Sequence, residues 1–548
     1  MTPAFVDAPG APGFLRPNPD LVQRFFPNPS QAPEVAIDTY YFEREKRPGS
    51  YRIFVQGESS AAGFPYGRWA SPAGLLQQRL QRSAPEREIE VIGTGMASVT
   101  SYMLLDLVDE VIAQRPDAIV IYTGHNEYLG IGGVGSSLAS AKSPAVARAV
   151  MRLRRLRLYR VIESALSPAT AQVARSATSN RTLMARIAAE RRIAFDSSLF
   201  RRGEEQFRGN LARILERYRA AGIPVFIGTL ASNERDQPPF ASSPPAAGEG
   251  SAQLRFARAA SLDAAGQFAA ARAEYLAAKD RDELRFRAPE SFNAMIRALA
   301  AEHGAVVVDT QAAIAARAGN GIIGNDVMTE HVHPNLDGYF ALASAFYHAI
   351  QPSIPGSSEI PDDVARAEQP VTPIDRLGGE YRVAVLKNDW PFVPERQPTQ
   401  FAPPATAEEV IAQRLFAGQV SWPNAMNEAI GHFDSTGNAL ESIRATANLA
   451  DAFVNLAAPQ HSAAVLMLRA NQPERALAYA TRAVRREPGS PDYLLTLAEA
   501  QFRTRRVAQS AETLRKILAS DPGETRARYW LGIVTQALQP QPASPPPN

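Results

Sequence analysis

Short apolar runs and amphipathic segments alternate along the first two thirds of the chain. The strand-like runs cover residues 53–55, 90–92, 118–122, 224–230 and 305–309. Between them lie helical patterns such as "SYMLLDLVDEVIAQ", whose apolar residues recur on one face, and "LDGYFALASAFYHAI" closes the series. Strands that are apolar on both faces and alternate with helices are typical of a parallel sheet covered on two sides. The pattern predicts a three-layer α/β/α domain with a five-stranded parallel sheet over residues 49–351.

Two segments interrupt this alternation, and we interpret both as helical insertions. Residues 136–200 are rich in Ala and Arg and include "RAVMRLRRLRLYRV". An amphipathic helix with a solvated basic face is the favoured interpretation, and a lid or a membrane-surface helix is the alternative. Residues 250–300 predict a helix pair that turns at Gly266.

The flanking regions carry weaker patterns. Residues 1–48 are rich in Pro, Asn and Phe without periodicity, and we expect an extended arm that packs over a domain edge. Residues 352–403 begin with Pro/Ser-rich sequence that indicates a linker or strap. The tail at 539–548, "QPQPASPPPN", is expected to be disordered.

A repeat occupies the C-terminal part. Pro488 and Pro522 end two similar segments and lie 34 residues apart, which is the tetratricopeptide spacing. Small or apolar residues recur at matching places, such as Ala476 and Ser510. We therefore predict that helix pairs over 404–538 stack as an all-α tetratricopeptide solenoid.

Composition excludes several classes of protein. The 58 basic and 56 acidic residues among 548 give a net charge of +2, which predicts neither nucleic-acid binding nor a strongly anionic partner. The absence of cysteine excludes disulfides, thiolate metal sites and cysteine nucleophiles. No apolar run approaches the ~20 residues needed to span a bilayer. The start, "MTPAFVDAPGAPG", lacks a signal-peptide pattern, so a soluble chain without an export signal is expected.

A serine, a histidine and an acid stand where such a sheet would bring them together. Ser59 follows the first strand-like run in "YRIFVQGESSAAG", and His333 lies three residues after Glu330 in "TEHVHPNLDGY". Acyl transfer by serine requires a base and a group that orients the base. The acid-x-x-His spacing lets Glu330 hold the imidazole within one loop. Ser59 taken alone is equally compatible with a helix N-cap or a turn.

Donors for an oxyanion also have candidates at strand ends. Gly95 in "GTGMAS" follows the second run and could present a backbone N–H without a side chain in the way. Asn126 in "TGHNEYLG" follows the third run and could point its amide to the same place, or merely hold a turn. Each group lies at the carboxyl edge of the predicted sheet, where open α/β sheets place their chemistry.

Four ordered blocks make the chain similar to a known family. They are Gly57-Glu58-Ser59, Gly95, Gly124-His125-Asn126-Glu127 and Glu330-x-x-His333-Pro334. This set resembles the SGNH (GDSL-type) hydrolase family, and the whole chain resembles its bacterial branch with C-terminal tetratricopeptide repeats. The resemblance implies a flavodoxin-like sheet followed by the repeat solenoid.

The same resemblance implies roles for the candidate residues. Ser59 would be the nucleophile, His333 the general base and then acid, and Glu330 the group that orients the imidazole. The oxyanion hole would comprise the Ser59 N–H, the Gly95 N–H and the Asn126 side chain. No cofactor and no metal ion are implied.

The chain departs from the family pattern in several places. Glu58, Glu127 and Glu330 stand where a shorter acid is commoner, and the added methylene of Glu330 requires a shifted loop. The block around Gly95 lacks the Asn often found near its start. Members of this branch commonly carry an N-terminal anchor, so the resemblance implies a periplasmic or membrane-associated protein, whereas this chain contains no transmembrane segment or export signal. Membrane association therefore stays open.

Several other histidines and charged residues are weaker candidates for a role in the site. Substrate binding is considered for five of them: His125, Glu127, His331, Arg285 and Arg287. A structural ion pair is the favoured role of the two arginines, and His331 is expected to line the pocket or cap a loop. An H-x-H metal pair at 331 and 333 is a rival interpretation that lacks a third ligand at convincing spacing.

Three functions follow from these patterns. The leading hypothesis is a serine esterase that acts on a small acyl ester, such as an acetylated carbohydrate. The second is an acyltransferase with a glycan acceptor, since the same triad serves both reactions. The third is an interaction protein in which the solenoid binds a protein partner and the α/β domain is an inactive scaffold.

Overall fold

The computed structural model describes residues 2–26, 40–136, 192–244 and 250–538, together with isolated positions between 137 and 191. The amphipathic helix predicted around "RAVMRLRRLRLYRV" and the tail predicted to be disordered at 539–548 lie outside the continuous described ranges.

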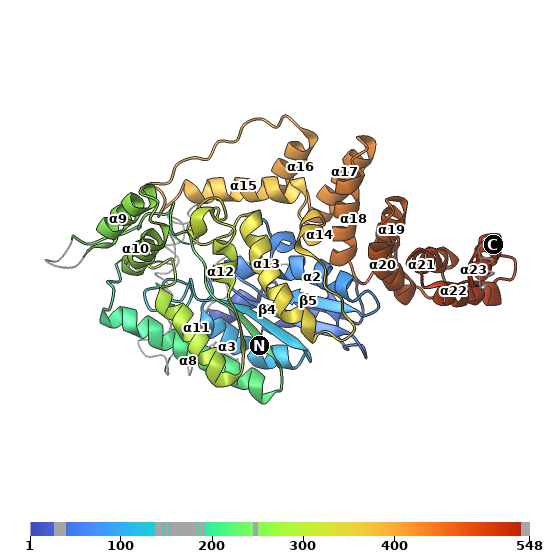
Figure 1. The fold of residues 1–548 in the computed structure, drawn as a ribbon, viewed down its shortest axis with the longest axis horizontal. Coiled ribbons are helices and arrows are strands. Elements are labelled where there is room, and N and C mark those ends of the chain that lie inside the picture. Colours follow the sequence, from blue (N-terminus) through green and yellow to red (C-terminus); the bar gives the residue numbers. More distant parts are fainter. Residues whose placement is uncertain are drawn as a thin grey trace, which may run out of the picture.

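A five-stranded parallel sheet forms the centre of the first domain (Figure 1). Its strands are β4 (Tyr51–Gly57), β5 (Ile89–Gly93), β6 (Ala118–Tyr122), β7 (Val225–Gly228) and β8 (Val306–Val308). The strand order β5-β4-β6-β7-β8 is that of a flavodoxin-like sheet. In this order β4, the first strand of the sheet along the chain, lies between β6 and the edge strand β5. The residues of β4 and β6 are buried throughout, because helices cover both faces. The predicted fold class is confirmed.

Two helical layers cover the sheet. The first contains α2 (Pro72–Ser83), α12 (Thr310–Ala315) and α13 (Leu336–Ile350), and α2 and α13 lie side by side over the sheet in Figure 1. The second contains α3 (Ser101–Ile112), α8 (Ser198–Ala220) and α11 (Glu290–His303), with α8 packed between the other two. Side chains of Ser71 and Ser197 cap α2 and α8, which satisfies N–H groups in their first turns.

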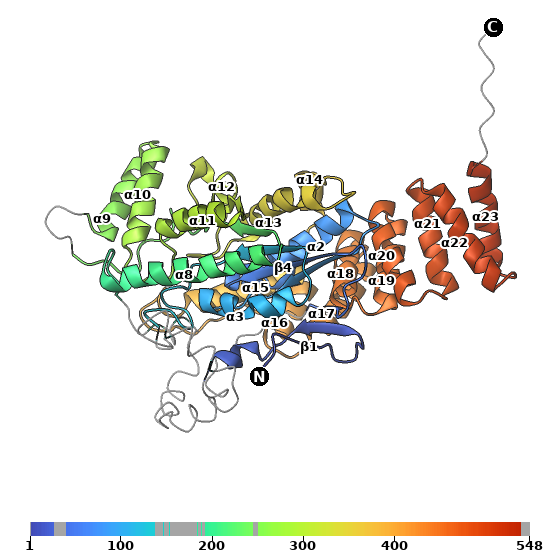
Figure 2. The same ribbon diagram turned by 90° about the horizontal axis from the view of Figure 1, so that it is seen from below.

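A helix pair projects from the domain at the end remote from the repeats, as Figures 1 and 2 show. It consists of α9 (Ala252–Ala264) and α10 (Phe268–Arg281), and the chain turns between them at Gly266 with φ +73°. The position of the turn agrees with the sequence expectation. The helix that begins at Glu290 is a separate element, since it belongs to the second layer over the sheet.

The N-terminal region differs from an extended arm. Strands β1 (Phe5–Asp7), β2 (Phe14–Pro17) and β3 (Phe42–Glu43) form an antiparallel sheet. The rings of Phe5 and Phe42 contact that of Phe54 in β4, which attaches this sheet to the main core. Strands of two to four residues are too short to show a periodic pattern, so the sequence did not indicate them.

The segment expected to be a linker or strap contains two helices, α14 (Asp362–Ala367) and α15 (Pro373–Lys387). Thr372 and Asp375 form a capping box at the start of α15, and Pro373 occupies its first turn. Proline is favoured at that position because its missing N–H has no partner there in any helix. The same residue made the stretch look like a linker in sequence.

Helices α16 to α23 continue the chain to residue 538 (Figure 2). They are α16 (Ala407–Phe416), α17 (Trp422–Ser435), α18 (Ala439–Ala452), α19 (Ala457–Arg469), α20 (Pro473–Arg486), α21 (Pro491–Arg503), α22 (Val507–Ser520) and α23 (Thr525–Leu538). Helices α18, α20 and α22 begin 34 residues apart, as do α19, α21 and α23. Neighbouring helices pack on one another, which is the one-dimensional stacking of a solenoid.

A buried ion pair within the repeats is hydrogen-bonded to the first domain. Asp451 of α18 accepts hydrogen bonds from Arg482 (2.7 Å) and Tyr479 (3.0 Å) of α20, and from Gln78 (3.1 Å) of α2. The indole of Trp69 also stacks on that of Trp422 in α17, with centroids 5.5 Å apart. The first repeat helices therefore form part of one packed structure with the sheet domain.

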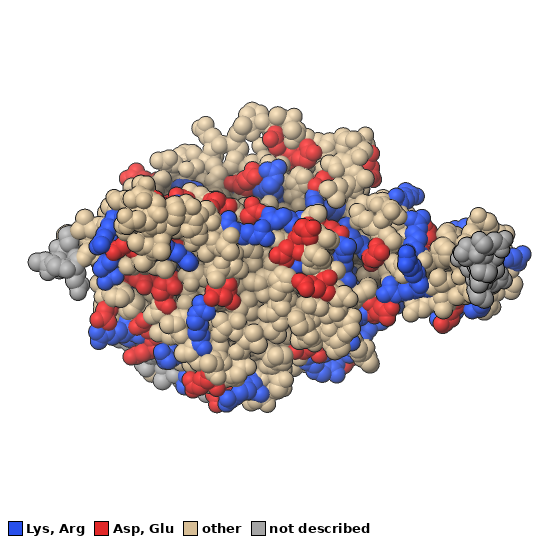
Figure 3. All heavy atoms as spheres, viewed as in Figure 1, with Lys and Arg blue, Asp and Glu red and all other residues tan. Residues whose placement is uncertain are grey.

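Short 3-10 helices complete the described elements, at Leu21–Phe25, Arg68–Ala70, Gly319–Gly321 and Gln351–Ser353. Basic and acidic side chains are interspersed over the face seen in Figure 3, in keeping with the net charge of +2. Within the described residues, no helix is both long and apolar enough to cross a membrane.

Candidate active site

The end of strand β4 places Ser59 at the carboxyl edge of the sheet. Gly57 ends the strand where it passes β6, and a Cβ there would lie 2.1 Å from the Tyr122 carbonyl oxygen. Only glycine fits this approach, so the chain can turn directly into α1 (Ser59–Ala62). Ser59 begins that short helix and remains half-buried, with access to solvent.

The imidazole of His333, which lies near the C-terminal end of the domain in sequence, contacts Ser59. Its Nε2 atom lies 2.7 Å from the Ser59 Oγ. The loop before α13 carries His333 and is folded back on itself, because Thr329 donates its N–H (2.8 Å) and its hydroxyl (3.0 Å) to the His333 carbonyl. The ring of Phe64 packs against the imidazole at 4.6 Å between centroids.

Glu330 holds His333 from within the same loop. Its Oε1 contacts the His333 Nδ1 and accepts the His333 backbone N–H at 2.9 Å. The glutamate side chain therefore spans the distance that the family usually bridges with a shorter acid. Burial alone would raise the pKa of Glu330, but its electrostatic interaction with His331 and His333, when these are protonated, and its hydrogen bonds to both hold that pKa well below its ordinary value. The group is an anion at neutral pH.

Of the two proposed oxyanion donors, Gly95 lies against α1, and Asn126 donates its backbone N–H to Glu58, the residue before Ser59. Gly95 approaches α1 so closely that a Cβ would lie 2.6 Å from the Ala62 nitrogen. The side-chain nitrogen of Asn126 is buried and has no hydrogen-bond partner among the described residues. A buried amide N–H without a partner is costly, and a developing oxyanion would satisfy it.

Glu58 has a role that the sequence did not reveal. Its carboxylate accepts from the Thr123 hydroxyl (2.9 Å) and from the N–H groups of Gly124 (2.7 Å) and Asn126 (3.1 Å). It thus ties the loop after β6 to the residue next to Ser59. Burial raises the pKa of Glu58 to about 8, although these three bonds oppose the change. The only signal in sequence was an acid directly before the serine.

Glu127, which was considered for substrate binding, is bonded within the protein. It is fully buried and accepts from the Ser101 N–H (2.9 Å), the Ser101 hydroxyl (2.7 Å) and Gln206 (2.7 Å). These bonds join the loop after β6 to helices α3 and α8. Its function in this arrangement is structural.

His125 is buried next to Asn126. Its Nδ1 accepts the Ala288 N–H at 3.2 Å, so the proton resides on Nε2, which has no partner among the described residues. Burial, with a smaller contribution from Lys279, lowers the pKa of His125 to about 3. The ring is therefore neutral at physiological pH.

The two arginines considered for substrate binding make structural contacts, and the ion pair of Arg287 is of the kind favoured for them from the sequence. Arg285 is buried, donates to the carbonyls of Ile193 (2.9 Å) and Asp280, and lies over the Phe200 ring. Arg287 pairs with Asp282 at 3.0 Å and donates to two backbone carbonyls. Both guanidinium groups hold the chain around α10 together.

His331 lies on the far side of Glu330 from His333. Its Nδ1 contacts the Glu330 Oε2, and its ring is surrounded by the side chains of Phe240, Phe286 and Phe392. His331 and His333 thus share one carboxylate and do not converge on a common empty point. In the part of the chain that the structure describes, no group of three or more His, Asp or Glu is placed to hold a metal ion.

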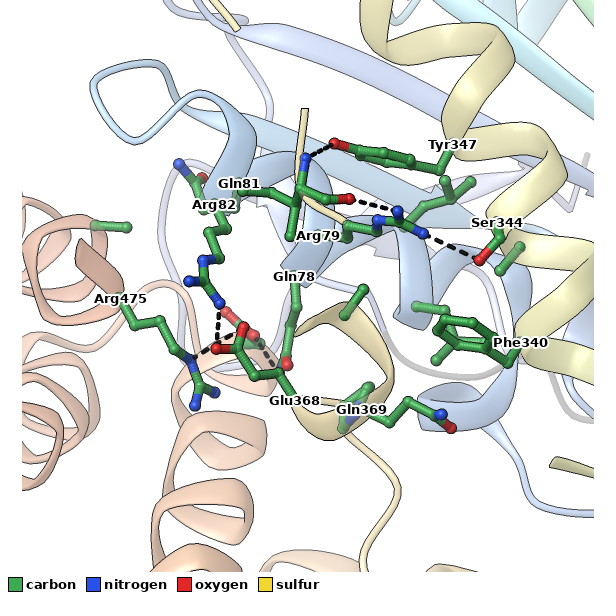
Figure 4. A pocket seen from close by; sticks show the side chains of 18 of the residues that line it. Gln78, Arg79, Gln81, Arg82, Phe340, Ser344, Tyr347, Glu368, Gln369 and Arg475 are labelled. Atoms are coloured by element: carbon green, nitrogen blue, oxygen red, sulfur yellow. Dashed lines mark hydrogen bonds and ion pairs between the residues drawn. The ribbon is translucent and has the colours of Figure 1, made fainter. Parts of the chain in front are cut away.

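A separate pocket lies between α2, α13, α14 and helix α20 of the repeats (Figure 4). Two of its arginines are paired: Arg79 with Asp362, beside a hydrogen bond to Ser344, and Arg82 with Glu368. None of the triad residues lines it. The pocket is an interdomain feature and contributes no group to the chemistry at Ser59.

Ser59, His333 and Glu330 thus lie in hydrogen-bonded order at the carboxyl edge of the parallel sheet. The chain belongs to the GDSL-like lipase/acylhydrolase family, whose model matches residues 55–341. A tetratricopeptide repeat model matches residues 467–532. The family resemblance identified from the sequence is thereby confirmed.

Solved structures with detectable similarity include a GDSL-like lipase from Bacteroides thetaiotaomicron, with 15% identity, coverage of 55% of this chain and 88% of that one, and a TM-score of 0.28. An acetylxylan esterase from Geobacillus stearothermophilus has 16% identity, covers 55% and 95%, and has a TM-score of 0.28. A lipase/acylhydrolase from Enterococcus faecalis has 16% identity, covers 57% and 99%, and has a TM-score of 0.28. The search of curated proteins gives no match.

Proposed function

We propose that the protein is a serine esterase that hydrolyses a small acyl ester. The observation that carries this proposal is the hydrogen-bonded series Ser59–His333–Glu330, with 2.7 Å between the His333 Nε2 and the Ser59 Oγ. Because Glu330 is an anion beside Nδ1, the proton of neutral His333 resides on Nδ1 and leaves Nε2 free to accept the serine proton.

The proposed reaction has two stages. The Ser59 Oγ attacks the ester carbonyl carbon as His333 takes its proton, and the tetrahedral oxyanion receives hydrogen bonds from the N–H groups of Ser59 and Gly95 and from the Asn126 amide. Collapse breaks the bond to the alcohol oxygen, which leaves with the proton from His333. Water, activated by His333, then attacks the acyl-enzyme, and the carboxylic acid departs as Ser59 regains its proton.

The proposed substrate is an ester of a short acyl group, such as acetyl, on a carbohydrate alcohol. The half-buried ring of Phe64 against His333 offers an apolar surface beside the reacting centre.

Transfer to a glycan hydroxyl is the alternative outcome of the same acyl-enzyme. The triad chemistry is unchanged, and the acceptor that attacks the acyl group decides between the two reactions. Product analysis with acetyl donor and candidate glycan acceptors separates them. Free acid as the sole product with every acceptor would argue against transfer.

The repeats supply a second candidate function, the binding of a protein partner. A groove on α19, α21 and α23 is lined by His461, Asp492, Leu495, Thr496, Glu499, Thr525, Arg526, Tyr529 and Trp530. Tyr529 is 70% exposed there, which is unusual for a large aromatic side chain. If the α/β domain is an inactive scaffold, the full chain should retain a specific partner in pull-down experiments and lose it with Tyr529→Ser, while every ester assay fails.

Covalent labelling tests the nucleophile directly. A fluorophosphonate probe reacts with an activated serine, and peptide mass spectrometry locates the adduct. We expect one adduct, on Ser59, in the wild-type protein and none in the His333→Ala variant, which retains the serine but lacks its base. An adduct on another serine, or equal labelling of the variant, would contradict the proposal.

A further inference from the structure

The acid of the triad contacts two histidines. Glu330 directs Oε1 to the Nδ1 and backbone N–H of His333 and directs Oε2 to the Nδ1 of His331. The whole carboxylate is buried, and His331 is only 2% exposed. The reaction as proposed above uses His333 and leaves His331 without a function.

The contacts of His331 determine which of its atoms carries the proton. Glu330 is an anion, so the atom facing it must be a donor, and His331 therefore holds its proton on Nδ1. Burial lowers the pKa of His331. His333 and Arg287 lower this pKa further, whereas Glu330 raises it. His331 is thus a neutral donor to the second oxygen of Glu330 at physiological pH.

Three separate segments fix the position of this imidazole. The Phe240 ring follows β7, Phe286 follows α10, and Phe392 follows α15, with centroids 5.5, 6.0 and 5.5 Å from that of His331. The backbone is fixed as well, since the Asn233 N–H donates to the His331 carbonyl at 2.9 Å. The segment after α15 thereby contributes to the surroundings of the triad.

The need for such a group arises from the length of the acid. Glutamate has one more rotatable bond than aspartate, so its carboxylate can rotate away from His333 unless its second oxygen is also held. We propose that His331 is a positioning residue that fixes the Glu330 carboxylate through Nδ1–H···Oε2 and so keeps His333 in the tautomer that accepts the Ser59 proton. This inference rests on the proposed esterase function and assigns no contact with substrate to His331.

Two substitutions separate hydrogen bonding from packing. His331→Asn places an amide N–H near the position of Nδ1 but removes the ring, whereas His331→Phe keeps a ring among the three phenylalanines and removes the donor. If His331 positions Glu330, kcat should fall about 10- to 100-fold in His331→Phe with KM within about twofold, and His331→Asn should recover most of kcat. If His331 only fills space, His331→Phe should instead have the higher kcat of the two variants, because Phe fits the aromatic surroundings better than Asn.

The same variants are informative if the wild-type protein hydrolyses no ester that is tried, which would be a failure of the proposed function itself. Imidazole N–H protons bound to a buried carboxylate appear at low field in proton NMR spectra. We expect two such signals in the wild-type protein, and the loss of one with a shift of the other in His331→Phe. Full kcat in an active His331→Phe protein, or a wild-type spectrum that His331→Phe leaves unchanged, would overturn the inference.

Discussion

The Nε2 atom of His333 lies 2.7 Å from the Oγ of Ser59, although 274 residues separate the two in sequence. Ser59 stands at the end of β4, in the interior of the sheet, and His333 precedes α13, the last helix of the α/β unit. The contact therefore depends on the whole domain between them. Substitutions that move either the start of α1 or the loop at 330–333 should impair activity while leaving the fold intact.

Loss of the charge on Glu330 should impair turnover more than binding. In Glu330→Gln the side chain keeps its length, but no anion stabilises the imidazolium that forms during the reaction. We expect kcat to fall about 100- to 10,000-fold. Steady-state kinetics on an activated acetyl ester measure this, with the exposed Glu359→Gln as a control that keeps wild-type kcat. A Glu330→Gln enzyme as fast as the control would refute the role of the acid.

A methyl group at Gly95 should displace the helix that carries the nucleophile. Its Cβ would meet backbone atoms of Ala61 and Ala62 at 2.9 and 2.6 Å, and backbone cannot move aside as a side chain does. We expect Gly95→Ala to lower kcat/KM about 100-fold in a protein that still folds, judged by circular dichroism. Gly431→Ala is the matched control, because nothing lies within 4 Å of its Cβ, and it should leave kcat/KM unchanged. Equal activity of the two variants would contradict the close approach.

Glu58 should make the stability of the protein depend on pH. Its pKa is about 8 in the folded protein and about 4.5 when unfolded, so the folded state binds more protons between these values. The free energy of unfolding should therefore fall as the pH rises from about 5 to 8. Glu58→Gln cannot ionise, and its melting temperature should fall less over the same interval. Thermal melts of both proteins at pH 5 and pH 8 test this, and parallel decreases would exclude Glu58 as a cause.

The buried ion pair between Asp451 of α18 and Arg482 of α20 should contribute strongly to stability. Asp451→Ala leaves the buried guanidinium of Arg482 without its partner, which costs about 3–5 kcal/mol in comparable sites. Urea unfolding followed by tryptophan fluorescence should show this loss. The exposed Glu512→Ala, which removes only a surface pair, should change the free energy of unfolding by less than about 1 kcal/mol. Similar values for the two variants would show that this buried ion pair adds little.

The sheet and the order of the site residues could be predicted because each depends on local sequence. Runs such as 118–122 are apolar on both faces and so indicate buried parallel strands, and the groups at their ends must meet at one edge. The helix that begins at Pro373 was missed because proline marks linkers and first helical turns alike. The short antiparallel strands near the N-terminus carry no period that could reveal them.

Roles that depend on contacts between distant loops could not be predicted. Glu58 holds the loop at 123–126, and Arg285 binds backbone carbonyls, including that of Ile193, 92 residues away. Neither partnership leaves a spacing signal, because each joins segments whose separation is set by the fold. The first histidine of "EHVH", His331, was visible in sequence, but its position on the far oxygen of Glu330 follows from the path of the loop.

The most direct test of the account is the rate of p-nitrophenyl acetate hydrolysis by the wild-type protein, Ser59→Ala and Ser60→Ala. Ser60 is the matched control, since Ser60→Ala removes the neighbouring hydroxyl, whose hydrogen bond to the Val332 carbonyl is long at 3.3 Å, and keeps the Ser59 hydroxyl. We predict hydrolysis by the wild-type protein, a rate within about threefold for Ser60→Ala, and a loss of at least about 1,000-fold for Ser59→Ala. Wild-type activity retained in Ser59→Ala would contradict the assignment of Ser59 as the nucleophile.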